Sequence, residues 1–209
     1  MFVGHLGIAF LGKRLRPLAP LGWLAVAAFL PDFVRVLLRV IVSSAWADFL
    51  SHSIPSVLVL GGVIGLAMAA YTGDWRIGVL AGALCLSHLS VDYITGCKPT
   101  WLYGPYLGAY LYHRPLWDLL LEVPLIVVAW ALLRRVLPPD TLLARPWVPA
   151  GLALLQLPML AWTCLGSSCK VAGVIWKASD DAVLPRPNGT PAEIACPSPD
   201  FRPPWTSGE

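Results

Sequence analysis

The chain has 209 residues, a net charge of +3, 57% hydrophobic residues and only 13% charged residues. A soluble domain carries about 25% charged residues, so this composition, with a mean hydropathy of +0.68, indicates an integral membrane protein. The small, dispersed positive charge gives no reason to expect a nucleic-acid partner. The sequence also contains no P-loop, no GxGxxG turn, no CxxC pair and no GxSxG elbow.

The apolar runs predict an all-α fold, a polytopic membrane bundle of about five long hydrophobic helices behind a short N-terminal segment. Residues 2–12 form that segment, which carries His5 and is too short to cross a bilayer, because a span needs about 20 residues. The first long helix is expected at 18–42. Pro31 should kink it, since proline lacks a backbone N–H and clashes with the preceding turn, and Asp32 follows at the kink.

Residues 43–52 are a polar interruption in which Asp48 and His52 are four positions apart. An apolar helix is expected next, at 53–71. The following helix, at 75–92, ends with a second pair of ionisable residues.

This second pair is His88 and Asp92, also four positions apart. Side chains at that spacing share one face of a helix, with about 5–6 Å between their Cβ atoms. The run before them is almost wholly apolar, and ionisable groups in such a place are a functional hypothesis by default. A hydrogen bond that merely joins two helices is the alternative.

The remaining helices are expected at 116–137 and 147–165, after a long loop at 96–115. We divide the chain into a membrane-embedded domain, 1–169, and a Pro-rich, poorly ordered tail, 170–209.

The distribution of Lys and Arg predicts the orientation in the membrane. Seven basic residues fall in the loops of one side, which is therefore cytoplasmic, and the C-terminal tail lies outside: Lys13, Arg14, Arg16, Arg76, Arg134, Arg135 and Arg145. With this topology the following residues all lie in the outer half or the outer loops: Asp32, Asp48, His52, His88, Asp92, His113 and Glu122. Charges that only stabilise individual helices would not need to share one level.

Imidazole nitrogens and carboxylate oxygens from several helices are the ligand set of carboxylate–histidine metal sites in helical bundles. We expect a divalent metal, Zn in the first place and Mn or Fe as alternatives. A metal lowers the pKa of bound water, so the expected reaction is hydrolysis of an ester or phosphoester. Glu122, a carboxylate in an apolar setting, is the candidate general base, and Asp48 is a second candidate catalytic carboxylate.

Two other readings remain open from the sequence. The polar residues could line the pathway of a small transporter, or they could hold helices together in a structural protein with no catalytic role. No internal repeat of the kind that transporters often carry is visible in the chain.

Four short motifs occur in a characteristic order, namely Gly4-His5, Pro31-Asp32, His52-Ser53 and Ser87-His88-x-x-x-Asp92. In order and spacing they resemble the bacterial inner-membrane proteins described as membrane-bound metal-dependent hydrolases, the YdjM-like group, over residues 1–135. The resemblance implies a helical fold in the inner membrane, hydrolase activity on a lipid-linked or membrane-surface substrate, and five candidate metal ligands: His5, Asp32, His52, His88 and Asp92.

The sequence also departs from that group at three places. The group often has His-Arg shortly before a Thr-His-Ser stretch, and here only Ser51-His52-Ser53 is present, with Asp48 one turn earlier. Val34 stands where a second Asp is common, and Gly96 stands where some members have a His. Cys97, the neighbour of Gly96, could replace that ligand, or the site could be incomplete and the protein a non-catalytic descendant.

Overall fold

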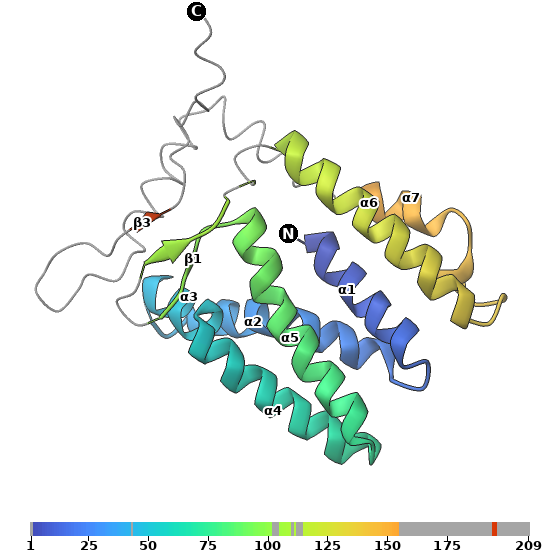
Figure 1. The fold of residues 1–209 in the computed structure, drawn as a ribbon, viewed down its shortest axis with the longest axis horizontal. Helices are drawn as coiled ribbons and strands as arrows, with labels where there is room; N and C mark the ends of the chain where they lie inside the picture. Colours follow the sequence, from blue (N-terminus) through green and yellow to red (C-terminus); the bar gives the residue numbers. More distant parts are fainter. Residues whose placement is uncertain are drawn as a thin grey trace, which may run out of the picture.

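The computed structural model describes residues 2–42, 44–101, 105–109, 111, 115–154 and 194–195, and these residues are mostly helical (Figure 1). The α-helices are α1 (Phe2–Leu15), α2 (Leu21–Leu38), α3 (Ser44–His52), α4 (Ile54–Thr72), α5 (Trp75–Thr95), α6 (Pro115–Leu133) and α7 (Val148–Leu154). Two short 3₁₀ turns, η2 (Arg134–Val136) and η3 (Leu142–Ala144), connect α6 to α7.

The helical membrane fold predicted from the sequence is confirmed in its main feature. Three described helices, α2, α4 and α5, are long and apolar enough to cross a membrane. The short N-terminal segment is present as α1, with 14 residues. The prediction of about five long hydrophobic helices is not confirmed, and much of the helix expected at 147–165 lies outside the described residues.

The polar interruption expected at 43–52 is instead a short helix, α3. The segment can fold in this way because Ala47 and Phe49 bury their side chains, and because the Ser51 hydroxyl donates to the Ala47 carbonyl. Ser53 then takes an extended conformation and caps α4 by accepting from the Ser56 amide. His52 is therefore the last residue of a helix that ends in a sharp turn.

Helix α1 is the central element of the packing. Its residue Ala9 belongs to a core shared with α2, α4 and α5, whereas Val3 and Phe10 belong to a second core shared with α6 and α7. In Figure 1, α1 accordingly runs between α5 and α6. The N-terminal end of α1 is thereby placed beside the C-terminal end of α5.

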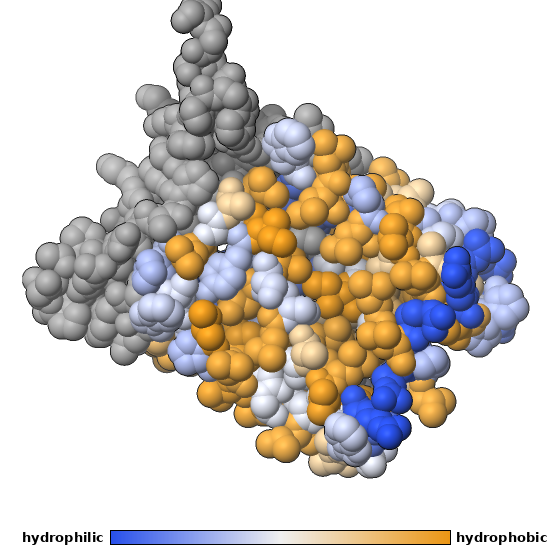
Figure 2. All heavy atoms as spheres, viewed as in Figure 1, coloured by the Kyte–Doolittle hydropathy of each residue, from blue (hydrophilic) through white to orange (hydrophobic). Residues whose placement is uncertain are grey.

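Polar residues are separated between the two ends of the bundle. Figure 2 shows hydrophobic side chains over most of one face and a strongly hydrophilic group at its lower right. In Figure 1 that region holds the ends of α1 and α6 and the turn from α4 to α5. The basic residues at these positions are Lys13, Arg14, Arg76, Arg134 and Arg135. Most of the predicted site residues lie towards the opposite ends of their helices.

A small sheet lies next to the end of α5. Its strands are β1 (Lys98–Pro99), β2 (Tyr106–Leu107) and β3 (Ile194–Ala195), in the order β1-β2-β3. β1 and β2 are antiparallel, and β3 runs parallel to β2. Of the predicted tail at 170–209, this strand is the part that the structure describes.

Helices α4 and α5 approach each other closely because glycines line their interface. Gly61 and Gly65 of α4 face Gly82 and Gly78 of α5, the spacing of small residues that allows close contact of helix backbones in membranes. A Cβ atom added at Gly78 would lie 2.5 Å from the Gly65 carbonyl oxygen, closer than a real Cβ atom can approach. The interface therefore requires glycine at this position.

Replacing Gly78 by Leu should destabilise the fold by about 1–3 kcal/mol or more, because a larger side chain forces the two helices apart. The measurement is thermal or denaturant unfolding of the purified protein in detergent. Gly62→Leu is the matched control, since Gly62 has no atom within 4 Å of an added Cβ. Equal stability of the two variants would contradict this account of the interface.

Candidate metal centre

The structure brings together the five residues that the sequence predicts as metal ligands. They come from four helices: His5 from α1, Asp32 from α2, His52 from α3, and His88 and Asp92 from α5. Their side chains are buried, except that of Asp32, which is 40% exposed. The cluster therefore reaches the surface through Asp32.

Four side-chain atoms of the cluster lie around His52 and His88. His52 Nε2 lies 3.3 Å from His88 Nε2, 3.3 Å from Asp32 Oδ1 and 3.3 Å from Asp92 Oδ2. His88 Nε2 lies 3.5 Å from Asp92 Oδ2 and 3.9 Å from Asp32 Oδ1. The four side chains therefore lie in one neighbourhood, and their roles as metal ligands stay a prediction.

The His88 ring is oriented by the backbone of α2. Its Nδ1 lies 2.8 Å from the carbonyl oxygen of Ala28, and a carbonyl oxygen can only accept. Nδ1 therefore carries the proton and donates, which leaves the lone pair of Nε2 directed at the cluster. Ala28 lies in the turn of α2 that contains Pro31, where the proline removes a backbone donor.

The His52 ring is oriented in the same way by its neighbour Ser51. Ser51 Oγ donates to the Ala47 carbonyl at 2.6 Å, so it accepts from His52 Nδ1, which lies 2.6 Å away. Nε2 of His52 is then unprotonated as well. Burial lowers the pKa of His52, and the charge of Lys98 adds to this effect. His52 is therefore in the neutral form that binds metals.

In the neutral tautomers assigned above, two imidazole lone pairs and two carboxylate oxygens lie close together, an arrangement that a bound cation would stabilise. Zn²⁺ binds imidazole and carboxylate at about 2.0–2.2 Å with tetrahedral geometry, so adjacent ligand atoms should be about 3.3–3.6 Å apart. Two groups of these residues have ligand atoms close enough together to hold an ion, namely Asp32 with His52 and His88, and His5 with His88 and Asp92. The buried residues could hold one metal ion.

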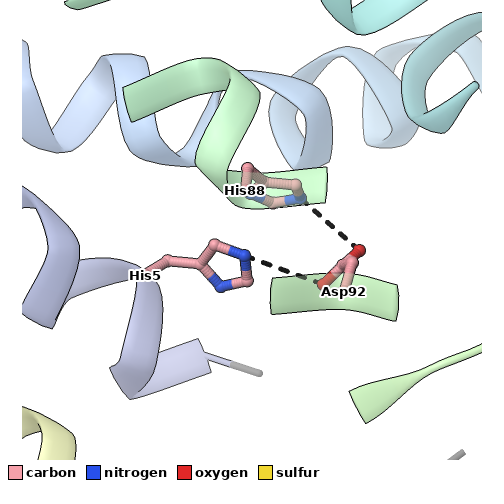
Figure 3. A group of neighbouring side chains, drawn as sticks. All are labelled: His5, His88 and Asp92. Carbon is pink, nitrogen blue, oxygen red and sulfur yellow. Dashed lines mark ion pairs between the residues drawn. The ribbon is translucent and has the colours of Figure 1, made fainter. Parts of the chain in front are cut away.

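His5 extends the cluster on the other side of Asp92. Its Nε2 lies 3.6 Å from Asp92 Oδ1, and its ring packs against that of His88 with centroids 3.9 Å apart. Figure 3 shows both imidazoles directed at Asp92, His5 from α1 and His88 from the same helix as Asp92. The oxygens of Asp92 are thus divided between His5 on one side and His52 with His88 on the other.

Lys98 is a member of the cluster that the sequence analysis did not select. Its Nζ lies 3.1 Å from Asp92 Oδ2, and the residue is buried. In the sequence it follows the apolar helix by a few residues within a Gly-rich loop, which suggests a surface residue. The sequence did contain a signal for this contact, because a Lys six positions after an intramembrane Asp can fold back on that Asp. Only the conformation of the loop shows that Lys98 does so.

Glu122, predicted as the general base, has a structural contact. Its Oε2 accepts hydrogen bonds from the backbone amides of Val3 at 3.0 Å and Gly4 at 3.1 Å. These amides open α1, and a carboxylate there also complements the positive end of the helix dipole. Glu122 therefore anchors the helix turn that carries His5, and its catalytic role stays a prediction.

Asp48, the second predicted catalytic carboxylate, is bound by arginines of α2. Arg35 contacts both of its oxygens, with Nη2 at 3.0 Å from Oδ2, and Arg39 Nη2 lies 3.9 Å from Oδ1. These contacts join α3 to α2 and so help to place His52. A catalytic role for Asp48 likewise stays a prediction, because these ion pairs already give Asp48 a structural role.

Cys97 is disulfide-bonded, so its thiolate does not replace the histidine ligand that some YdjM-like proteins have near this position. Val34 and Gly96, two positions at which the sequence departs from the YdjM-like motifs, have no side-chain ligand atom. His113 lies outside the described residues.

No model of a known protein family matches this sequence. No curated protein and no solved structure has detectable similarity to it. The geometry of the cluster therefore carries the functional inference.

Replacing Ser51 by Ala should weaken metal binding about 10- to 100-fold, because the acceptor that fixes the His52 tautomer is lost. The measurement is competition for Zn²⁺ against a chelating dye. Ser56→Ala is the control, since Ser56 donates to the Phe49 carbonyl at the same helix junction. A Ser51 variant that binds Zn²⁺ as tightly as the unmodified chain would contradict the assigned tautomer.

Replacing Glu122 by Ala should lower the free energy of unfolding by about 1–3 kcal/mol, because two backbone amides lose a charged acceptor. Glu122→Gln should lose less, since its carbonyl oxygen can still accept. Denaturant unfolding in detergent measures both. The two roles differ in activity. Glu122→Gln should stay active if Glu122 only anchors α1, and it should lose all activity if Glu122 is the general base.

Proposed function

We propose that the chain is a membrane-embedded, metal-dependent hydrolase of an ester or phosphoester. The divalent cation, Zn in the first place, would be held by His52, His88, Asp32 and Asp92, with His5 in contact with Asp92. One observation carries this proposal. Both imidazoles give their Nδ1 protons to acceptors outside the cluster, so both free nitrogens are directed at two carboxylates.

A bound cation supplies Lewis acidity and lowers the pKa of a water molecule. The chain contributes the rest of the site. Ala28 and Ser51 fix the imidazoles, buried side chains limit the access of bulk water, and Asp92 places its oxygens among three histidines. The partly exposed Asp32 marks the edge at which a substrate would meet the site.

The place in the membrane is part of the same proposal. The bundle would lie in a bacterial inner membrane with about five spans, including α6 and the helix at 147–165. The metal centre and the C-terminal tail would lie on the outer side, since more of the basic loop residues lie at the other end of the bundle than at this one. Phe33, Val36 and Leu37 of α2 are exposed next to Asp32, which suits a substrate at the membrane surface. The YdjM-like motifs agree with this reading.

Metal analysis of the purified protein should give about one Zn, Mn or Fe per chain, and hydrolysis should stop when the metal is removed. His88→Leu should lose both metal and activity. It should leave a folded protein, whereas in a purely structural pair the loss of His88 would cost about 3–5 kcal/mol of stability, because a buried Asp92 is left without this partner. Asp140→Asn is the control, since it removes an exposed carboxylate outside the cluster and should keep the metal.

The double variant His88→Leu with Asp92→Leu separates the hydrolase from a purely structural network. Replacement of both partners by apolar residues can be nearly neutral for stability. Under the proposed function the double variant should therefore be stable but inactive and metal-free, whereas a purely structural pair predicts recovered stability with function intact. If it is active, the hydrolase does not use these residues.

A further inference from the structure

Lys98 supplies a positive charge at the metal centre that metal binding alone does not require. Its side chain is buried, and Nζ lies 3.1 Å from Asp92 Oδ2, the oxygen that also faces His52 and His88. Removing an ammonium group from water is costly. Asp92 is the ion-pair partner of this buried lysine, and the cost of burying the ammonium suggests that Lys98 also has a functional role.

The backbone around Lys98 is held from several sides. Lys98 pairs with Leu107 across the β1–β2 hairpin. Beyond β1, the Thr100 carbonyl accepts from the Ile54 amide at the start of α4. The amide of Ala109 donates to the Tyr93 carbonyl of α5. The ammonium is thus positioned by a loop that is fastened to two membrane helices.

The charges of the cluster indicate what this ammonium could bind. The carboxylates of Asp32 and Asp92 and the ammonium of Lys98 are the charged groups of the cluster, and imidazoles are neutral when they bind a metal. A divalent cation would change the net charge of the cluster from negative to positive. A positive, partly desolvated site favours an anionic substrate over a neutral one.

A second positive region adjoins the exposed edge of the cluster. Arg35 and Arg39 follow Asp32 on α2, and Asp48 is the carboxylate that contacts both of them. Two guanidinium groups against one carboxylate leave a positive charge close to the proposed entrance. An approaching anion would therefore meet positive charge first at α2 and then at Lys98.

We propose that Lys98 is a substrate-binding residue and that the substrate is a phosphate ester; this rests on the hydrolase function proposed above. A lysine ammonium is a compact charge that binds phosphate oxygens well. It has three N–H groups, of which Asp92 Oδ2 can accept one. The others can donate to phosphoryl oxygens, whereas a neutral carboxylic ester gives no reason to bury an ammonium here.

The reaction is then the transfer of a phosphoryl group to water. The oxygen of water forms a bond to phosphorus, and the bond from phosphorus to the ester oxygen breaks. The departing alkoxide takes a proton that originates from water and leaves as the alcohol. A monoester yields inorganic phosphate and a diester yields a phosphate monoester. The same phosphoryl chemistry can come from a lipid headgroup or from a water-soluble ester.

The first test is binding of inorganic phosphate to the Zn²⁺-loaded full chain in detergent, measured by calorimetry. Lys98→Gln should weaken phosphate binding about 10- to 100-fold, because charge-assisted hydrogen bonds are lost. Its zinc content should be unchanged. Lys98→Arg should keep most of the affinity. Arg14→Gln, which removes an exposed charge from the far end of α1, is the control and should bind phosphate normally.

The second test uses the unmodified chain, so that it does not depend on the folding of any variant. Hydrolysis is compared for p-nitrophenyl phosphate, p-nitrophenyl acetate and vesicles that contain phosphatidic acid. Release of phosphate from either phosphoester, with little hydrolysis of the acetate, supports the proposal. Phosphatidic acid as the better substrate identifies a lipid source, and the soluble phosphate as the better one identifies a soluble source.

The outcomes distinguish this inference from the function on which it rests. Hydrolysis of the acetate without phosphate binding overturns the role of Lys98 and leaves the hydrolase in place. Phosphate binding that depends on Lys98, without hydrolysis of any ester, overturns the hydrolase and leaves an anion site. Phosphate binding that is equal in the unmodified chain and in Lys98→Gln rejects Lys98 as a substrate-binding residue.

Discussion

The burial of two imidazoles and two carboxylates in the candidate metal centre is the constraint on which the rest of this structure depends. Nε2 of His52 and Nε2 of His88 lie 3.3 Å apart, with two carboxylates beside them. Helices that place such groups together must be held by contacts elsewhere. The glycine interface of α4 and α5, the ion pairs between α2 and α3, and the Glu122 anchor of α1 each hold one of the contributing elements.

The surrounding hydrogen bonds determine what the cluster can do. If the Ala28 carbonyl and the Ser51 hydroxyl were absent, each imidazole could turn its N–H inward and satisfy a carboxylate. The cluster would then be an ordinary hydrogen-bonded network. The acceptors outside the cluster prevent this, and they lie on α2 and α3 rather than on the helix that carries His88. The orientation of the His88 ring is therefore a product of tertiary packing, whereas that of the His52 ring is set within its own helix.

Much of this site could be predicted from local sequence patterns. The spacing of His88 and Asp92 gives their common helix face directly, because a helix fixes which side chains are neighbours. The convergence of Asp32 and His52 on that pair followed from the shared level of the polar residues. The helices α4 and α5 followed from apolar runs of sufficient length, with turn residues between them.

The remaining features depend on contacts that are distant in sequence or on loop conformation. Lys98 enters the cluster through a hairpin whose fold a Gly-rich sequence does not specify. Glu122 was read as a base because its setting is apolar, but it contacts amides 118 and 119 residues away. Helix α3 was missed because its polar residues conceal a buried face, and a nine-residue helix depends on packing more than on propensity.

The uneven exposure of the ligands affects how quickly a metal exchanges. Asp32 is the ligand with substantial contact to the surface, and the other four candidate ligands are buried. An ion that enters or leaves must shed its water beside this one carboxylate, and no second route is evident among the described residues. Loading and release should therefore be slow compared with an open surface site. The metal present when the helices assemble would then be retained, whatever the order of affinities at equilibrium.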